Sequence, residues 1–362
     1  MLVHKAYKYR IYPSESQQQL IGQMFGCCRF VFNYFLSLWN ARYEETGNGL
    51  SYNACATQLP ALKGEHEWLK AVDSIALQSA VRHVADSFDR FFKRQNRQPR
   101  FKSRKNPVQS YTTRQTNGNI AVNGNQLKLP KLGWIRFAAS RPLEGRILSA
   151  TVRRNAAGKF FVAIVCELDV QPLPQENKTV GIDLGLKEFA VCSDGLSVEN
   201  PRTFRRYERK LAAWQRRLAR RTKGGANWQK AKRQVALIHE KIANVRHDFL
   251  HKLTTKLVRE NQTIHIEGLR VANMLQSPRL AKSIADASWS EFRRQITYKS
   301  EWYGRQLKVA DSFAPTSQTC HVCGHVHPEV KNLSVRKWTC PVCQTLHDRD
   351  ENAAHNIEQM AV

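Results

Sequence analysis

Residues 320 to 352 read CHVCGHVHPEVKNLSVRKWTCPVCQTLHDRDEN, and the four cysteines in this stretch have the spacing C-x2-C-x16-C-x2-C. Two CxxC pairs at this separation can fold back and offer four thiolates to one tetrahedral Zn²⁺. The predicted ligands of this structural zinc are Cys320, Cys323, Cys340 and Cys343. A disulfide framework is the alternative, but disulfides belong mainly to small secreted chains. The sequence therefore predicts a zinc ribbon over residues 320–345.

The composition points to a polyanionic partner. The chain has 362 residues, enough for two or three domains, and a formal net charge of +27. Charge of this size opposes a compact state unless a polyanion neutralises it, and nucleic acid is the natural partner. A membrane surface is the alternative, but the sequence has no 18-residue apolar run and no signal peptide. We expect a protein of a reducing cytoplasm, with its other five cysteines as core thiols.

The N-terminal half combines strands with inserted helices. Residues 3–12 alternate as a strand does, and Ser14 with Gln17 forms a capping box for a helix that runs to about Tyr43. A second helical pattern covers about 74–96. Short β-type segments fill 108–175 and include a hairpin. We expect the first strand to join that sheet, with the helices inserted between.

Two stretches concentrate positive charge. A basic run crosses 93–105, and residues 202–250 form a helical pair with 15 Lys and Arg against 3 acids. The first run could be an ordinary solvated face, but the net charge of the whole chain favours contact with phosphates, and the helical pair would pack on its apolar stripe and offer its other side to phosphates. The predicted backbone contacts are Arg100, Lys102, Arg104, Lys105, Arg216, Arg217, Arg220 and Arg221.

Three carboxylates form the candidate catalytic site. Asp183 and Glu267 each stand on an otherwise apolar strand, and Asp350 stands where a terminal helix begins. A lone acid is usually solvated or paired, but three that converge would repel one another unless divalent cations neutralised them. Carboxylates suit Mg²⁺ or Mn²⁺, and two such ions can hydrolyse a phosphodiester. Asp348 competes for the third position, but it falls in the preceding loop and is better placed to cap the helix.

The motifs around these acids resemble a known family. Residues 181–185 (GIDLG), residues 266–269 (IEGL), the CxxC pairs and residues 348–357 (DRDENAAHNI) are similar to the split RuvC nuclease and zinc ribbon of the TnpB family. These are transposon-encoded, RNA-guided DNA endonucleases related to the type V CRISPR effectors. The resemblance spans nearly the whole chain and includes residues 9–13 (YRIYP) and the basic hairpin.

The resemblance implies an α/β multi-domain fold. A β-barrel wedge domain would occupy 1–13 and 106–175, with a helical recognition domain inserted at 14–105. An RNase H-like (RuvC) nuclease domain would occupy 176–319 and 346–362, with the zinc ribbon inserted. Asp183, Glu267 and Asp350 would then be the metal-binding catalytic acids.

The same resemblance implies the partners. They would be a guide RNA from the transposon end and a target DNA next to a short flanking motif, with a separate transposase encoded by the same element. We expect a monomer associated with the nucleoid of a prokaryotic cell. Two other functions stay open: a regulator that binds nucleic acid without cutting it, and a transposase that joins DNA ends. The intact acids speak against the regulator.

Overall fold

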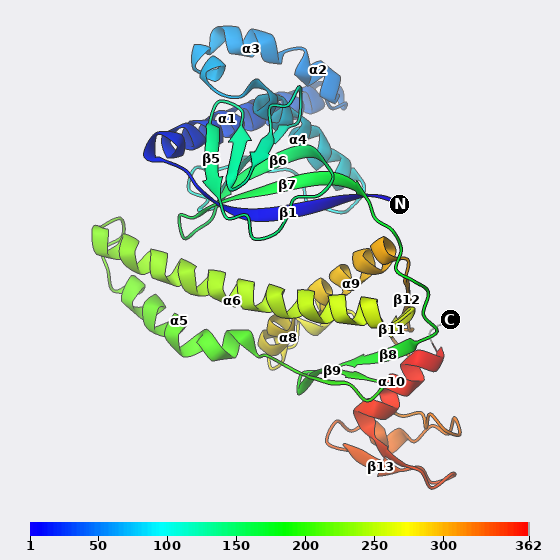
Figure 1. Cartoon of the computed structure of the whole chain (residues 1–362). Coiled ribbons are helices and arrows are strands. Elements are labelled where there is room, and N and C mark those ends of the chain that lie inside the picture. Colours follow the sequence, from blue (N-terminus) through cyan, green and yellow to red (C-terminus); the bar gives the residue numbers. More distant parts are fainter. Residues whose placement is uncertain (361–362) are drawn as a thin grey trace. The chain divides into compact units, whose positions relative to one another are not determined.

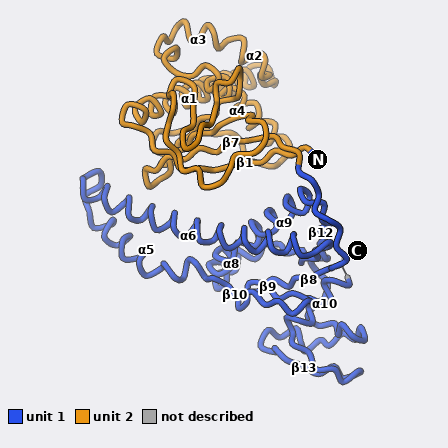
Figure 2. The backbone as a smooth tube through the Cα atoms, in the orientation of Figure 1, with its two compact units in different colours: residues 1, 170–362 blue, residues 2–169 orange. Residues whose placement is uncertain are grey.

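The computed structural model describes residues 1–360, which fall into two compact units (Figures 1 and 2). One unit is Leu2–Asp169, and the other holds Met1 and the residues from Val170 onward. The division between these units falls at residue 169, whereas the expected domain boundary was residue 175. Leu173 N donates to Tyr303 O at 3.1 Å and Arg305 Nη1 donates to Pro174 O at 2.7 Å, so the linker belongs to the second unit.

The N-terminal unit is built on a seven-stranded antiparallel sheet of order β2-β6-β7-β1-β5-β4-β3. Its strands are β1 (Leu2–Tyr12), β2 (Gln109–Arg114), β3 (Ala121–Asn123), β4 (Gln126–Leu129), β5 (Gly133–Phe137), β6 (Arg146–Arg154) and β7 (Phe160–Asp169). β1 pairs with β7 and β5, which confirms that the first strand joins the sheet formed after the helices. β2 and β3 end the described ladder, so backbone hydrogen bonds between those two strands do not close the implied barrel.

The helices of this unit lie between β1 and β2 in the sequence. They are α1 (Glu15–Thr46), α2 (Tyr52–Ala56), α3 (Leu59–Glu65), η1 (Glu67–Ala71) and α4 (Ser74–Phe92). The capping box is confirmed: Ser14 Oγ accepts from Gln17 N at 3.3 Å, and Gln17 Oε1 accepts from Ser14 N at 3.0 Å. The helices α2 and α3 have 5 and 7 residues, which is too short for hydrophobic periodicity to identify them.

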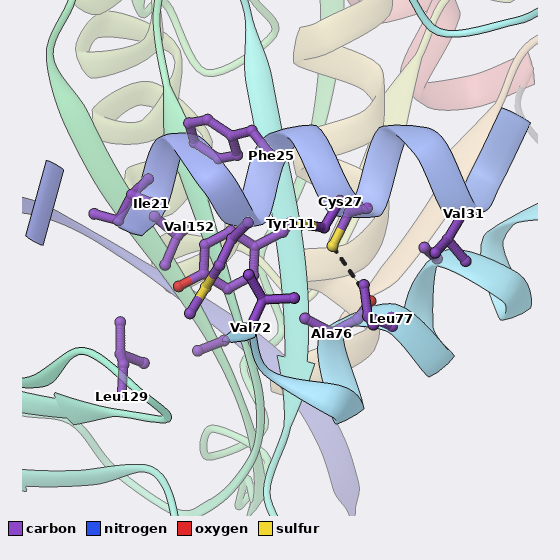
Figure 3. Packing of buried hydrophobic residues seen from close by; sticks show 14 of the residues in the cluster. Ile21, Phe25, Cys27, Val31, Val72, Ala76, Leu77, Tyr111, Leu129 and Val152 are labelled. Atoms are coloured by element: carbon purple, nitrogen blue, oxygen red, sulfur yellow. Dashed lines mark hydrogen bonds between the residues drawn. The ribbon is translucent and has the colours of Figure 1, made fainter. Parts of the chain in front are cut away.

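Helices and sheet of the N-terminal unit share one hydrophobic core. Phe25 of α1 packs on Tyr111 of β2 with ring centroids 5.9 Å apart, and Leu77 of α4 is fully buried in the same cluster (Figure 3). The inserted helices therefore share one core with the sheet.

The C-terminal unit contains a five-stranded mixed sheet of order β10-β9-β8-β11-β12. Its strands are β8 (Thr179–Leu184), β9 (Glu188–Cys192), β10 (Ser197–Glu199), β11 (Thr263–Ile266) and β12 (Gln306–Val309). β8, β11 and β12 are parallel, whereas β9 and β10 run antiparallel at one edge. β8 and β11 are largely apolar and mostly buried, as expected for strands covered on both faces, whereas β12 at the other edge is partly exposed.

The α-helices described in this unit are α5 (Thr203–Ala219), α6 (Ala226–Glu260), α7 (Val271–Met274), α8 (Ala281–Ala287), α9 (Trp289–Tyr303) and α10 (Arg349–Met360). The basic hairpin extends further than the expected 202–250, because α6 continues to Glu260. Leu253 and Leu257 in that extension are buried in the core of the mixed sheet. The basic arms pack on each other through a small cluster that includes Leu211, Trp214 and Ile238.

The zinc ribbon consists of the 3₁₀ helix η2 (Pro328–Lys331) and the two-stranded sheet of β13 (Lys337–Thr339) and β14 (Leu346–Asp348). Trp338 and His347 face each other across that sheet. In the part of the chain that the structure describes, no helix is both long and apolar enough to span a bilayer.

Candidate functional site

Two of the predicted acids meet at the ends of neighbouring parallel strands. Ile182 of β8 is in register with Ile266 of β11, so the next residues, Asp183 and Glu267, lie beside each other. Burial, followed by the hydrogen-bonding contact and negative charge of Glu267, raises the pKa of Asp183 well above its ordinary value. The two carboxyl groups therefore resist being ionised at the same time.

Two glycines allow other segments to approach this pair closely. A Cβ at Gly181 would lie 2.7 Å from the backbone nitrogen of Glu358 and overlap the carbonyl of Ala354, so α10 packs directly on the backbone of β8. A Cβ at Gly268 would lie 2.6 Å from the carbonyl oxygen of Ala310, at the end of β12. Any larger residue would push these neighbours away from the acids.

The third acid, Asp350, stands in the first turn of α10. Its negative charge also contributes to the raised pKa of Asp183. Its carboxylate, however, is engaged by Arg336 Nη1, which lies 3.1 Å from Oδ1 and 3.2 Å from Oδ2. Among the described residues only the four cysteines bring three or more metal-ligating atoms within 4.8 Å of one another. The structure thus brings the three acids into one region without closing them into a metal cage.

The charges of these acids bear on what they could bind. Three carboxylates at one point repel one another in the absence of cations, and a neighbouring guanidinium is the alternative source of positive charge. The donor set fits the predicted ions, since carboxylate oxygens are what Mg²⁺ and Mn²⁺ prefer. The roles of Asp183, Glu267 and Asp350 as metal ligands stay predictions.

Asp348 has the capping position that its place in the sequence indicates. Its Oδ1 accepts from the backbone nitrogens of Asp350 at 3.0 Å and Glu351 at 3.4 Å. A side chain that accepts hydrogen bonds from two free N–H groups at a helix start acts as the N-cap of that helix. This supports the choice of Asp350 over Asp348 as the acid that faces the site.

The four cysteines of the ribbon form one compact cluster. Their Sγ atoms lie within 4.8 Å of one another, with Cys320–Cys343 and Cys323–Cys340 both at 3.6 Å. The hydrogen bond between Cys343 Sγ and Thr345 Oγ1 is the largest of the interactions that lower the pKa of the Cys343 thiol to about 6. Four thiols at these separations fit the tetrahedral arrangement of a structural zinc site, so the geometry of the cluster indicates one.

Three residues that sequence reasoning did not single out connect the ribbon to the acids. Asn352 Nδ2 and Asn356 Nδ2 both donate to the carbonyl oxygen of Thr319, at 2.7 and 2.6 Å, and thereby fix α10 to the first cysteine knuckle. Arg336 leaves the ribbon and reaches Asp350. The i, i+4 spacing of the asparagines could have been read from the sequence, whereas nothing in the sequence points to Arg336.

The predicted phosphate contacts are solvent-exposed, with one qualification. Arg216 and Arg217 lie in the last turn of α5, and Arg220 and Arg221 follow it. Lys102 differs from the rest of its run, because its ammonium lies 3.8 Å from the ring centroid of Phe32 and desolvation lowers its pKa. It therefore has a structural partner already. The assignment of all eight residues to phosphates stays a prediction.

Comparison with known proteins identifies the class. A family model described as "Probable transposase" matches residues 163–278, one described as "Cas12f1-like, TNB domain" matches residues 289–357, and a "Helix-turn-helix domain" model matches residues 1–48. In the structure that last segment is strand β1 followed by the single helix α1. The fold is similar to that in a cryo-EM structure of a Cas12f1–sgRNA–target DNA complex, with a TM-score of 0.67, 13% identity and 99% of each chain covered.

Relatives of higher identity define the family. A "Putative RNA-guided DNA endonuclease" of Streptomyces pristinaespiralis is 40% identical over 98% of this chain and 89% of its own length. The "Putative RNA-guided DNA endonuclease InsQ" of Escherichia coli (strain K12) is 35% identical over 98% of this chain and 91% of its own length. The chain therefore belongs to the TnpB family of RNA-guided DNA endonucleases, and the α/β multi-domain fold class is confirmed.

Proposed function

We propose that this protein is the RNA-guided DNA endonuclease of a transposon and hydrolyses phosphodiester bonds at Asp183, Glu267 and Asp350. The observation that carries the proposal is the pairing of Asp183 with Glu267 at adjacent strand ends, where burial and mutual repulsion raise the pKa of Asp183. Such a pair, at the carboxyl ends of parallel strands, needs a cation to hold both charges. The relatives of this chain are named for the same activity.

The three acids would hold Mg²⁺ or Mn²⁺, which would supply an activated water and stabilise the leaving oxygen when bound. The chain's own residues supply the geometry. Gly181 and Gly268 admit α10 and the end of β12 close to the acids. Asp348 fixes the start of α10 through its two backbone contacts. The ribbon holds the same helix through Asn352 and Asn356.

The proposed partners, a guide RNA and a target DNA, follow from the charge of the chain and from its relatives. The formal net charge of +27 suits a guide RNA held along much of the protein, with pairing to the guide supplying sequence specificity. In this proposal the N-terminal unit recognises a short motif that flanks the target. The same unit binds the guide RNA, which comes from the transposon end. The protein would act as a monomer in the nucleoid region of a prokaryotic cytoplasm, beside a separate transposase of the same element.

The test is cleavage of a guide-matched duplex by the protein with its RNA. Asp183→Ala, Glu267→Ala and Asp350→Ala should each abolish cleavage and leave target binding intact, and chelation should have the same effect until Mg²⁺ is restored. Asp348→Ala is the matched control and should retain cutting with a less stable α10. If Asp350→Ala still cuts and Asp348→Ala does not, the third ligand is misassigned.

A second function has one observation in its favour, which is the match of residues 163–278 to a model described as a transposase. The same acids could serve strand transfer. The two functions differ in their products, because strand transfer joins DNA ends and hydrolysis leaves free ones. Site-specific cutting by RNA-free protein, or joined products, would favour the transposase.

A further inference from the structure

Helix α10 carries Asp350 and contacts both the mixed sheet and the zinc ribbon (Figure 1). Ala354 lies one helical turn after Asp350, and its carbonyl oxygen lies close against Gly181 of β8. Asn352 and Asn356 lie on another face of the same helix and are each only 1% exposed. Both asparagines donate to the first cysteine knuckle. The helix that places the third acid is therefore held by the sheet on one face and by the ribbon on another.

The carboxamide of Asn352 binds the residues on both sides of Cys320. Its Oδ1 accepts from the backbone nitrogen of His321 at 3.0 Å, and its Nδ2 donates to the carbonyl oxygen of Thr319 at 2.7 Å. Cys320, between these two residues, is fully buried and is one of the predicted zinc ligands. Asn356 Nδ2 donates to the same Thr319 oxygen at 2.6 Å. The backbone around a zinc ligand is thus hydrogen-bonded directly to α10.

A second connection joins the first residue of α10 to the loop that precedes β13. The backbone nitrogen of Arg349 donates to the carbonyl oxygen of Arg336 at 2.8 Å. The buried guanidinium of Arg349 donates through Nη1 to the carbonyl oxygen of Asn332 at 2.9 Å. Arg349 directly precedes Asp350, and Asn352 follows two residues after it. The ribbon therefore fixes the chain on either side of the third acid.

The ribbon itself depends on its metal. Its buried core is a small cluster of Val330, Trp338, Cys320 and Cys340. Two of these four residues are predicted zinc ligands, and a structural zinc contributes folding free energy directly. Loss of zinc should therefore loosen the backbone around Cys320. Because Asn352 is hydrogen-bonded to that backbone, the start of α10 should become less fixed as well.

We propose that Asn352 is a positioning residue that couples the zinc ribbon to the acids, so that the acids bind a divalent cation tightly only while zinc is bound. The inference rests on the proposed function, because it takes Asp350 as a ligand of that cation. Zinc then has no part in hydrolysis, but its loss weakens the nuclease site by releasing α10. Coupling between two binding sites is reciprocal, so a cation at the acids should also tighten the binding of zinc.

A double-mutant cycle on the full chain tests this coupling, with Mn²⁺ affinity measured by electron paramagnetic resonance. Cys340→Ser removes a zinc ligand, and Asn352→Ala removes the connection while all four thiols remain. Each change alone should weaken Mn²⁺ binding by about 5- to 150-fold, the usual range for coupling between two sites. The double variant should bind Mn²⁺ no more weakly than the weaker single variant, because both changes break the same connection. Asn352→Ala should still hold about one zinc per chain by elemental analysis.

The same helix offers a matched control and a second variant. Ala353→Gly weakens α10, because glycine is a poor helix former, but leaves the side-chain hydrogen bonds to the ribbon in place. Its effect on Mn²⁺ affinity should add to that of Cys340→Ser. Asn356→Ala removes one donor to Thr319 and should give a smaller loss than Asn352→Ala. It replaces Asn352→Ala in the cycle if circular dichroism shows that the latter is unfolded.

The outcomes separate the coupling from the nuclease. Unchanged Mn²⁺ affinity in zinc-depleted Cys340→Ser, or additive losses in the double variant, would overturn the coupling while guided cleavage by the wild-type protein stands. Loss of zinc from Asn352→Ala would make this residue part of the ribbon's own fold and would overturn its positioning role. Losses that do not add, in a protein that binds Mn²⁺ but cuts no DNA, would keep the coupling and discard the nuclease.

Discussion

Arg336 Nη1 of the zinc ribbon donates to both carboxylate oxygens of Asp350 at the start of α10, at 3.1 Å to Oδ1 and 3.2 Å to Oδ2. The pair is partly exposed, with side-chain exposures of 51% and 26%. Arg336 also lines a cavity of about 420 Å³ together with Lys187 and Arg205. The guanidinium therefore stands between a carboxylate proposed to bind metal and a basic cavity that suits phosphate.

The first prediction concerns competition for Asp350. Arg336→Gln should strengthen binding of Mn²⁺ in the absence of nucleic acid, because the cation no longer displaces a guanidinium. An exposed pair contributes at most about 1 kcal/mol, so the gain should not exceed about fivefold. Titration followed by Mn²⁺ electron paramagnetic resonance measures it. Lys337→Gln removes the same charge one residue away and should leave the affinity unchanged. Weaker binding in Arg336→Gln would show that Arg336 supports the metal site.

The second prediction concerns the raised pKa of Asp183. A carboxyl whose folded pKa exceeds the ordinary value of 3.8 stabilises the fold below that value, and this contribution is lost as the pH rises through the folded pKa. In chelator, Asp183→Asn should therefore raise the urea midpoint at neutral pH and flatten its decline above pH 4. The same variant should lose divalent-metal binding. A lower midpoint at neutral pH would mean that Asp183 is not repelled by Glu267.

The sequence was sufficient where local chemistry decides the structure. The capping box at Ser14, the apolar strands around Asp183 and the CxxC spacing each depend on a few neighbouring residues, and the structure places all of them as expected. The sequence alone was insufficient where tertiary contacts determine the structure. The extension of α6 to Glu260 depends on burial against the sheet. The contact of Arg336 with Asp350 depends on how the ribbon folds back on α10, which no periodicity encodes.

The third prediction separates the zinc ligands from a close neighbour. His347 Nε2 lies 3.1 Å from Cys320 Sγ, so a mixed site with a histidine ligand is the alternative to four thiolates. Cys340→Ser should lower the zinc content below about one ion per chain and destabilise the fold, because structural zinc contributes folding free energy directly. His347→Gln should keep the zinc. Elemental analysis of the two purified variants measures their zinc content. Loss of zinc in His347→Gln would show that His347, and not one of the four cysteines, is a zinc ligand.

The fourth prediction concerns a buried cation. Lys299 Nζ donates to His251 O, Thr254 Oγ1 and Thr255 Oγ1 and forms no ion pair with an acid among residues 1–360, and desolvation lowers its pKa to about 8. The unfolded chain therefore binds more protons between pH 8 and 10.5, and stability from this group rises across that window. Lys299→Met should be more stable at pH 7 by on the order of 1–2 kcal/mol, since lost hydrogen bonds offset part of the desolvation cost.

Urea unfolding at a series of pH values measures this effect. The advantage of Lys299→Met over the wild-type protein should shrink as the pH rises from 8 to 10.5. Lys256→Met, at an exposed position of α6, should show no such trend. A constant difference across the window would mean that Lys299 keeps its ordinary pKa in the folded protein.

The last prediction concerns the basic hairpin. Replacing Arg216, Arg217, Arg220 and Arg221 together with Gln should weaken RNA binding, because these exposed side chains stand at the turn between α5 and α6. The slope of log affinity against log salt should fall by about one unit for each phosphate that is no longer neutralised. Stability should change little, since the hairpin packs through Leu211, Ile238 and Ile242 on its apolar side.

Filter binding at several salt concentrations gives that slope, and a control is available in the same chain. Four exposed residues of the N-terminal unit lie outside both predicted phosphate-binding runs: Arg42, Lys70, Arg90 and Lys128. Neutralising these four removes the same charge, so it tests whether net charge alone holds the RNA. An equal reduction of the slope in both variants would mean that the polyanion is held by the overall field of the protein. A reduction confined to the hairpin variant would assign the phosphate contacts to the turn between α5 and α6.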